Sequence, residues 1–141
     1  MNLFRHIGIV VQDMQKALFF YKDLLGFEVT KDMNESGNYI DKFSKLDNVV
    51  VRTVKLKDPS GNLIELLKYA SHPKNNCPHE ITDIGISHFA LTVDDVEGLY
   101  EQLSKQGVTF NCYPQVTPDQ YAKVTFCKDF EGNLIELVEV L

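Results

Sequence analysis

The strongest constraint on the fold is an internal repeat that covers most of the chain. Residues 58–67 (DPSGNLIELL) and 129–138 (DFEGNLIELV) share an aspartate and the run Gly-Asn-Leu-Ile-Glu-Leu. Upstream, residues 6–13 (HIGIVVQD) and 88–95 (HFALTVDD) both begin with histidine, continue as an apolar run and end with aspartate. Because each copy of a repeated sequence folds into the same kind of unit, the repeat predicts two equivalent modules.

The residues between the repeated segments predict the same order of elements in both halves. Apolar residues at helical spacing follow Asp13, and a second such stretch follows Asp95. Asp13 is the expected N-cap of the first helix, while Asp94 with Glu97 resembles a capping box for the second. Strands are expected at residues 27–30, 49–56 and 63–67 and, in the second half, at 108–110, 123–127 and 134–138.

The expected fold class is therefore α+β, with two βαβββ modules. We place the first module at residues 1–70, a linker at 71–83 and the second module at 84–141, because the linker is rich in proline and polar residues. The separation between the repeated histidine and glutamate is 59 residues in the first half (65 − 6) and 48 in the second (136 − 88). The 11 extra residues are expected in the polar stretch 33–46.

Composition excludes several classes of protein. A net charge of −6 and a pI near 5.1 argue against a nucleic acid or an anionic membrane as the main partner. No apolar run reaches the ~18 residues that a membrane span needs, and the first residues have no signal-peptide pattern. Cys77, Cys112 and Cys127 are odd in number and never form a C-x-x-C pair, which is typical of a reduced, cytoplasmic protein with small apolar thiols.

Two histidines and two glutamates occupy equivalent positions in the two halves. Glu65 and Glu136 lie within apolar strands, where a carboxylate is costly unless it is paired, protonated or bound to a metal. The alternative is that this strand face is solvated. His6 and His88 begin the first strand of each half. If the modules pack around a pseudo-twofold axis, these four side chains meet, and together they suit a divalent ion such as Zn, Ni, Co, Mn or Fe.

The repeated motifs resemble the vicinal-oxygen-chelate superfamily, which includes glyoxalase I, methylmalonyl-CoA epimerase, extradiol dioxygenases, fosfomycin-resistance enzymes and bleomycin-resistance proteins. The resemblance covers nearly the whole chain, so that the two modules together form one domain of this type. It implies that the paired sheets form an open barrel around one divalent metal ion, and that the protein is a homodimer. The segments that carry it are residues 6–11 (HIGIVV), 20–27 (FYKDLLGF), 58–66 (DPSGNLIEL), 87–93 (SHFALTV) and 129–137 (DFEGNLIEL).

The ligand set that the resemblance implies is His6, Glu65, His88 and Glu136. A complete set of this kind is most similar to bacterial glyoxalase I, whereas the epimerase usually has glutamine at the position of Glu65 and the dioxygenases use two histidines and one glutamate. Val10 and Tyr69 stand where glyoxalase I has an arginine that helps to hold glutathione and an asparagine. The resemblance therefore implies the metal chemistry of glyoxalase I, while two residues expected of glyoxalase I, one of which helps to hold glutathione, are replaced and the use of glutathione or CoA stays open.

The function that follows is that of a metal-dependent lyase or isomerase of the glyoxalase I type. It would transfer a proton next to a carbonyl through a metal-bound enediolate, with Glu136 as the base and Glu65 as its partner. The substrate would be a small molecule with neighbouring oxygens. Three alternatives stay open: an isomerase like methylmalonyl-CoA epimerase, an Fe or Mn oxidoreductase like the dioxygenases, and a non-catalytic small-molecule-binding protein like the bleomycin-resistance proteins.

Substrate-binding residues are expected on or near the middle strands of each half. Arg52 interrupts an apolar strand, so it either faces a cavity and meets an anion or is a charge on an edge strand. The candidates are Tyr39, Arg52, Tyr121 and Lys123.

Overall fold

The computed structural model describes residues 1–75 and 79–141, so Cys77 and part of the expected linker lie outside the described residues. The chain divides into two compact units, Met1–Asn76 and Cys77–Leu141. The more finely drawn boundaries at residues 70/71 and 83/84 stay predictions. Among the described residues, no helix is both long enough and apolar enough to cross a membrane.

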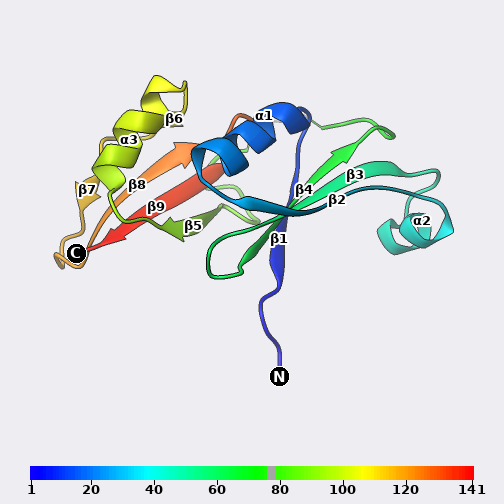
Figure 1. Cartoon of the computed structure of the whole chain (residues 1–141), viewed down its shortest axis with the longest axis horizontal. Coiled ribbons are helices and arrows are strands. Elements are labelled where there is room, and N and C mark those ends of the chain that lie inside the picture. Colours follow the sequence, from blue (N-terminus) through cyan, green and yellow to red (C-terminus); the bar gives the residue numbers. More distant parts are fainter. Residues whose placement is uncertain (76–78) are drawn as a thin grey trace. The chain divides into compact units, whose positions relative to one another are not determined.

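The first unit is a four-stranded sheet with helices (Figure 1). The strand order is β1-β4-β3-β2; β1 runs parallel to β4, and the other neighbours are antiparallel. The elements are β1 (His6–Val10), α1 (Met14–Leu18), the π-helix η1 (Phe19–Leu24), β2 (Glu28–Ser36), α2 (Asn38–Ser44), β3 (Val50–Lys57) and β4 (Leu63–Tyr69).

The second unit repeats this plan with one additional short strand. Its main path is β5-β9-β8-β6, with β5 parallel to β9, and β7 pairs with β8. The elements are β5 (His88–Thr92), α3 (Val96–Lys105), β6 (Thr109–Phe110), β7 (Gln115–Val116), β8 (Ala122–Lys128) and β9 (Leu134–Val140). The expected α+β class is therefore confirmed, with a βαβββ order of the main elements in each unit.

Aspartate caps set the starts of α1 and α3. Asp13 caps α1 as expected, because its Oδ1 accepts a hydrogen bond from the backbone N–H of Lys16 at 3.0 Å. The capping box expected at Asp94 is wrong: Asp95 is the N-cap of α3, and its Oδ1 accepts from the N–H of Gly98 at 2.9 Å. Gly98 permits this close approach, since a Cβ there would lie 2.3 Å from the Asp95 carboxylate.

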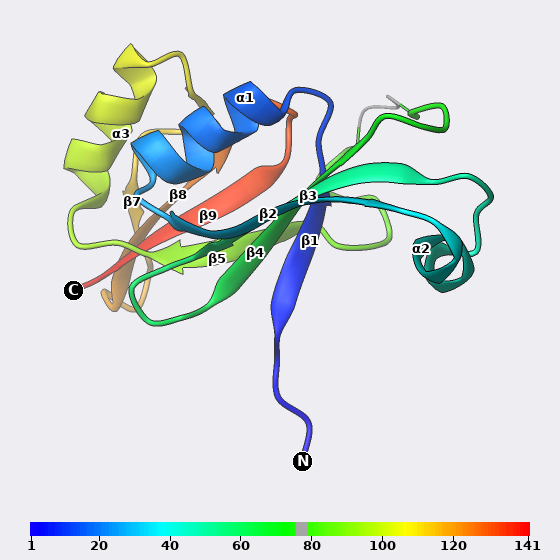
Figure 2. The same cartoon turned by 45° about the vertical axis from the view of Figure 1, so that its right-hand side comes forward.

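The 11 extra residues of the first unit form regular structure. The strand expected at 27–30 instead extends through Ser36 as β2, and α2 follows before the chain returns along β3. Figure 2 shows α2 at the end of the β2–β3 pair that lies away from α1. None of the residues of β2 is fully buried, so the strand has no apolar alternation by which a sequence could predict its length.

One face of each sheet forms a core with the helices. In the first unit Leu56, Ile64 and Leu66 are buried, as are Phe20 and Tyr21 of η1. In the second unit the equivalent strand residues are buried together with Val96 and Leu103 of α3; they are Cys127, Ile135 and Leu137. The strand residues that alternate with these positions, including both repeated glutamates, lie on the opposite face of each sheet, which we call the site face.

The cysteines differ in their surroundings. Cys127 lies in the core, where burial and the nearby charge of Asp129 raise the pKa of its thiol to about 12. It is thus the small apolar thiol that the sequence predicts. Cys112 is exposed, and both are free thiols.

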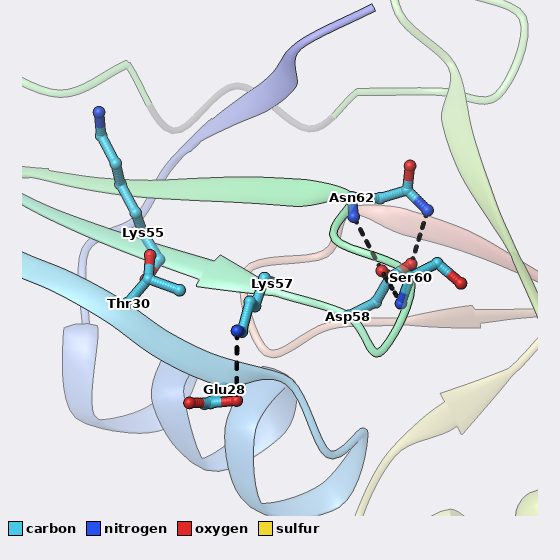
Figure 3. A network of polar contacts seen from close by, with 7 residues as sticks. All are labelled: Glu28, Thr30, Lys55, Lys57, Asp58, Ser60 and Asn62. Atoms are coloured by element: carbon cyan, nitrogen blue, oxygen red, sulfur yellow. Dashed lines mark hydrogen bonds and ion pairs between the residues drawn. The ribbon is translucent and has the colours of Figure 1, made fainter.

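The repeated Asp-x-x-Gly-Asn motif is the turn between the last two strands of each unit. Asp58 Oδ1 accepts hydrogen bonds from the backbone N–H groups of Ser60 (2.9 Å) and Asn62 (2.8 Å), and its Oδ2 accepts from Asn62 Nδ2 at 2.8 Å (Figure 3). Gly61 has φ +89°, a left-handed conformation that favours glycine. Asp129 makes the same three contacts in the second unit, at 3.0, 2.8 and 2.9 Å, and Gly132 has the same φ.

This turn determines which residues are opposite one another on the paired strands. In the first unit it pairs Lys57 with Leu63, and therefore Lys55 with Glu65. In the second unit the same register pairs Phe126 with Glu136. A shift by one residue would move each glutamate to the core face, so the turn is what keeps the carboxylates on the site face.

Removing the Asp58 carboxylate is expected to destabilise the first unit. Burial raises the pKa of Asp58, but the hydrogen bonds from Asn62, Ser60 and Gly61 outweigh it and hold the pKa below its ordinary value of 3.8. Asp58→Ala should lower the free energy of unfolding by about 1–2 kcal/mol, measured by urea denaturation at pH 7.

The difference should be full above the ordinary carboxyl pKa and should vanish as the pH falls through the lower pKa of the folded state. Ser60→Ala is the control, because only the backbone N–H of Ser60 is used, and it should change stability by less than about 0.5 kcal/mol. Equal stability of Asp58→Ala and wild type would contradict this account of the turn.

Removal of a buried hydroxyl on the site face of β3 is expected to stabilise the first unit. Thr53 Oγ1 is buried and has no hydrogen-bond partner among the described residues, and the second unit has Val124 at the equivalent position. Thr53→Val should raise the free energy of unfolding by about 1 kcal/mol, because it removes an unsatisfied hydroxyl. Thr125→Val is the matched comparison: its hydroxyl donates to Cys112 O at 2.7 Å, so this change should cost about 1 kcal/mol.

Candidate functional site

Each unit brings one repeated histidine together with one repeated glutamate. Nε2 of His6 lies 3.1 Å from Oε2 of Glu65, and Nε2 of His88 lies 3.3 Å from Oε2 of Glu136. The carboxylates are the more buried partners, with side-chain exposures of 15% and 28% against 35% and 34% for the imidazoles. The same pair, with nearly the same geometry, is therefore built twice.

Parallel pairing of the first and last strands creates these contacts. His6 is opposite Leu63 and Gly8 is opposite Glu65, so the imidazole and the carboxylate are diagonal neighbours on one face of the sheet. The residue directly opposite the glutamate is small in both units, Gly8 in the first and Ala90 in the second. The strand register thus places both His–Glu pairs at the same diagonal position.

The second pair has two additional neighbours. Phe126 packs edge-on against the ring of His88, with centroids 4.9 Å apart and an interplanar angle of 85°. Nδ1 of His88 lies 3.1 Å from Ser87 Oγ. A partner on the second ring nitrogen fixes the orientation of an imidazole, as is common for histidines that bind a metal through the other nitrogen.

The distances within each pair fit two ligands of one metal ion. Two donor atoms bound to the same ion at about 2.1 Å lie about 3.0–3.4 Å apart in octahedral or tetrahedral geometry. Imidazole nitrogen and carboxylate oxygen are also the donors that divalent transition metals accept. Within each unit, no third His, Cys, Asp or Glu of the described residues joins a pair, so each unit by itself supplies two donors.

The four candidate substrate residues lie away from these pairs in their own units. Arg52 is on the sheet face opposite Glu65, where its Nε and Nη2 donate to Asp32 at 3.0 and 2.8 Å. This guanidinium holds the pKa of Asp32 below its ordinary value. Lys123 Nζ lies 3.3 Å from a Glu97 carboxylate oxygen of α3, so both cations already have a carboxylate partner.

The two tyrosines are on the surface. Tyr39 of α2 is 76% exposed and stacks on Phe43, with centroids 5.9 Å apart and ring planes 12° from parallel. Tyr121 is exposed, immediately precedes β8, and donates its backbone N–H to Asp119 at 3.0 Å. Substrate binding by these four residues stays a prediction.

One residue of the site face was missed at the level of the sequence. Lys55 is directly opposite Glu65, and its Nζ lies 3.9 Å from the glutamate oxygen that faces His6. The signal was present, because a turn at residues 58–62 places residue 55 opposite residue 65. Alternation along β3 then puts Lys55 and Arg52 on opposite faces, so that Lys55 lies on the face that carries Glu65.

Comparison with known proteins agrees with this architecture. A family model described as the Glyoxalase/Bleomycin resistance protein/Dioxygenase superfamily matches residues 3–137. Among relatives, the uncharacterised YraH of Bacillus subtilis is 25% identical over 135 residues, which cover 96% of each chain.

Solved structures share the fold. A glyoxalase family protein from Bacillus cereus matches with a TM-score of 0.88 at 23% identity, over 100% of this chain and 97% of that one. The glyoxalase I of Leishmania major matches with a TM-score of 0.64 at 22% identity (99% and 87% covered). The fosfomycin resistance protein FosX of Listeria monocytogenes, solved with Mn(II) and sulfate, matches with 0.65 at 15% identity (100% and 94%).

The repeated βαβββ plan, the duplicated His–Glu pair and the family model that spans nearly the whole chain lead to one conclusion. The chain belongs to the glyoxalase/bleomycin resistance protein/dioxygenase superfamily.

Proposed function

We propose that this chain is a metal-dependent lyase or isomerase that transfers a proton next to a carbonyl, as glyoxalase I does. The observation that carries the proposal is the duplicated His–Glu pair, whose donor atoms are 3.1 and 3.3 Å apart in the two units. An isolated His–Glu contact is explained as an ordinary hydrogen bond. The same contact recurs at equivalent positions of two sheets, each on an otherwise apolar strand, and this recurrence favours a common function in metal binding.

In this proposal the ligands are His6, Glu65, His88 and Glu136, and they hold one divalent ion. When bound, the ion would polarise the carbonyl of the substrate and offset the negative charge that develops as the neighbouring proton leaves. The substrate would be a small molecule with two neighbouring oxygens. Divalent Zn, Ni, Co, Mn and Fe all accept this donor set, and elemental analysis would identify the ion.

Glu136 is the proposed base, with Glu65 as its partner. Its side chain is 28% exposed, whereas that of Glu65 is 15% exposed and has a lysine ammonium 3.9 Å away. A more exposed carboxylate beside an aromatic ring rather than a cation is better placed to swing towards a substrate proton and return it to an adjacent or opposite carbon.

The four proposed ligands come from two units, which would bind one ion together either within one chain or between two chains. A homodimer is part of the proposal for this reason, as is a cytoplasmic, reducing environment that keeps the thiols free. The proposal does not extend to glutathione as a co-substrate. Val10 stands where glyoxalase I has an arginine that helps to hold glutathione, and Tyr69 stands where it has an asparagine.

Elemental analysis of the purified protein tests the proposal directly. We expect one divalent transition-metal ion for each set of two His–Glu pairs. Replacement of either histidine by alanine should lower the metal content at least tenfold, while His72→Ala, a change at an exposed histidine outside both pairs, should leave it unchanged. A chain that stays metal-free after incubation with each ion would favour a non-catalytic binding protein.

A substitution at Glu136 separates binding from chemistry. Glu136→Gln keeps an oxygen donor but cannot accept a proton, so the variant should retain metal and lose at least 100-fold in the exchange of substrate α-protons with solvent. The measurement is ¹H NMR in D₂O with a small α-hydroxy ketone such as dihydroxyacetone. Exchange at the wild-type rate in Glu136→Gln would remove Glu136 from the role of base.

A further inference from the structure

The two copies of the site differ in charge on the strand next to the glutamate. Lys55 is directly opposite Glu65 in the first unit, and Phe126 is directly opposite Glu136 in the second. Two positions further along, both strands have a lysine, Lys57 in the first unit and Lys128 in the second. The first copy therefore has a cation on the site face where the second copy has an aromatic ring.

The ammonium group of Lys55 donates no hydrogen bond to the described residues around it. Its Nζ lies 3.9 Å from Oε2 of Glu65, too far for a hydrogen bond, and that same oxygen lies 3.1 Å from Nε2 of His6. No hydrogen bond from this ammonium to any described residue is found, and the side chain is 30% exposed. Its three N–H donors are thus available on the site face.

The neighbouring lysine of β3, Lys57, is paired with a carboxylate of a different strand and serves as a comparison for Lys55. Lys57 Nζ lies 3.8 Å from a carboxylate oxygen of Glu28 on β2, and both side chains are well exposed. In Figure 3 the two lysines leave β3 in opposite directions, Lys57 towards Glu28 and Lys55 away from it. Lys55 instead reaches towards β4, which carries Glu65.

The charge balance of the proposed metal centre favours an anion beside Lys55. This step rests on the proposed function. A divalent ion held by the two glutamates would be balanced by their charges, so that Lys55 would add one positive charge before substrate enters. An ammonium 3.9 Å from an oxygen of a carboxylate that holds such an ion would be unfavourable at low dielectric unless an anion is bound beside it.

We propose that Lys55 binds an anionic oxygen of the substrate, and that the substrates are small acids whose carboxylate adjoins the reacting carbonyl. The ammonium would hold the carboxylate by a charge-assisted hydrogen bond, while the two neighbouring oxygens of the reacting carbons lie at the metal. The competing explanation is that Lys55 only neutralises Glu65. The two explanations differ in whether ligand charge matters.

Two probes of similar size separate them. Hydroxypyruvate and dihydroxyacetone both carry a hydroxymethyl group next to a ketone, and they differ in having a carboxylate or a second hydroxymethyl group at the other end. Affinity is measured by isothermal titration, and exchange of the hydroxymethyl protons is followed by ¹H NMR in D₂O. Wild type should prefer hydroxypyruvate in both measurements.

Lys55→Gln should weaken hydroxypyruvate binding and exchange by about 10- to 100-fold, as expected for the loss of one charge-assisted hydrogen bond, and should change the values for dihydroxyacetone by less than about threefold. Lys55→Arg should retain the preference for the acid. Lys57→Gln is the matched control and should behave as wild type. A Lys55→Gln variant that loses both probes equally, or neither, overturns the inference.

The same experiment distinguishes failure of this inference from failure of the proposed function. Metal content and exchange of dihydroxyacetone report on the proposed function and do not require Lys55. If they are normal and the acid preference survives in Lys55→Gln, only the inference is wrong. If the protein holds no metal, the hydroxypyruvate titration of wild type against Lys55→Gln still decides whether Lys55 binds the anion.

Discussion

The geometry of the site depends on the hydrogen bonds of one five-residue turn, which occurs twice. The aspartate that begins the turn gathers two backbone N–H groups and an asparagine side chain, and the glycine takes a left-handed conformation. Together they fix the pairing of the last two strands. The glutamate three positions beyond the asparagine is thereby held on the face away from the core, next to the histidine of the first strand.

The duplicated plan gives the two copies the same contacts and different surroundings. The same parallel register places a His–Glu pair diagonally across the first and last strands of both copies. Beside this shared arrangement, β3 presents Thr53 and Lys55 on the site face, while β8 presents Val124 and Phe126 at the equivalent positions. Polar groups are thus concentrated in the first copy and apolar groups in the second, so that the shared pair is set in two different environments.

The sequence predicted the parts of the fold that depend on apolar alternation and on the repeat. The βαβββ order and the turns follow from these signals, as do the equivalent positions of the two histidines and the two glutamates in their strands. Three features did not: the length of β2, whose residues are all at least partly exposed; the cap at Asp95, which depends on the absence of a Cβ at Gly98; and the partners of Arg52. The length of β2 and the partners of Arg52 depend on tertiary pairing, which local patterns do not encode, whereas the choice between Asp94 and Asp95 depends on local helix geometry. Lys55 could have been identified by counting outward from the turn.

The placement of α2 has a consequence for how proteins of this plan can diverge. The insertion that distinguishes the first unit lies at one end of β2 and β3, and the register-setting turn lies at the other end of β3 (Figure 2). Residues can be gained or lost at the α2 end without changing which side chains are opposite Glu65, because pairing is counted from the turn. An insertion or deletion at α2 is therefore compatible with an unchanged contact between His6 and Glu65.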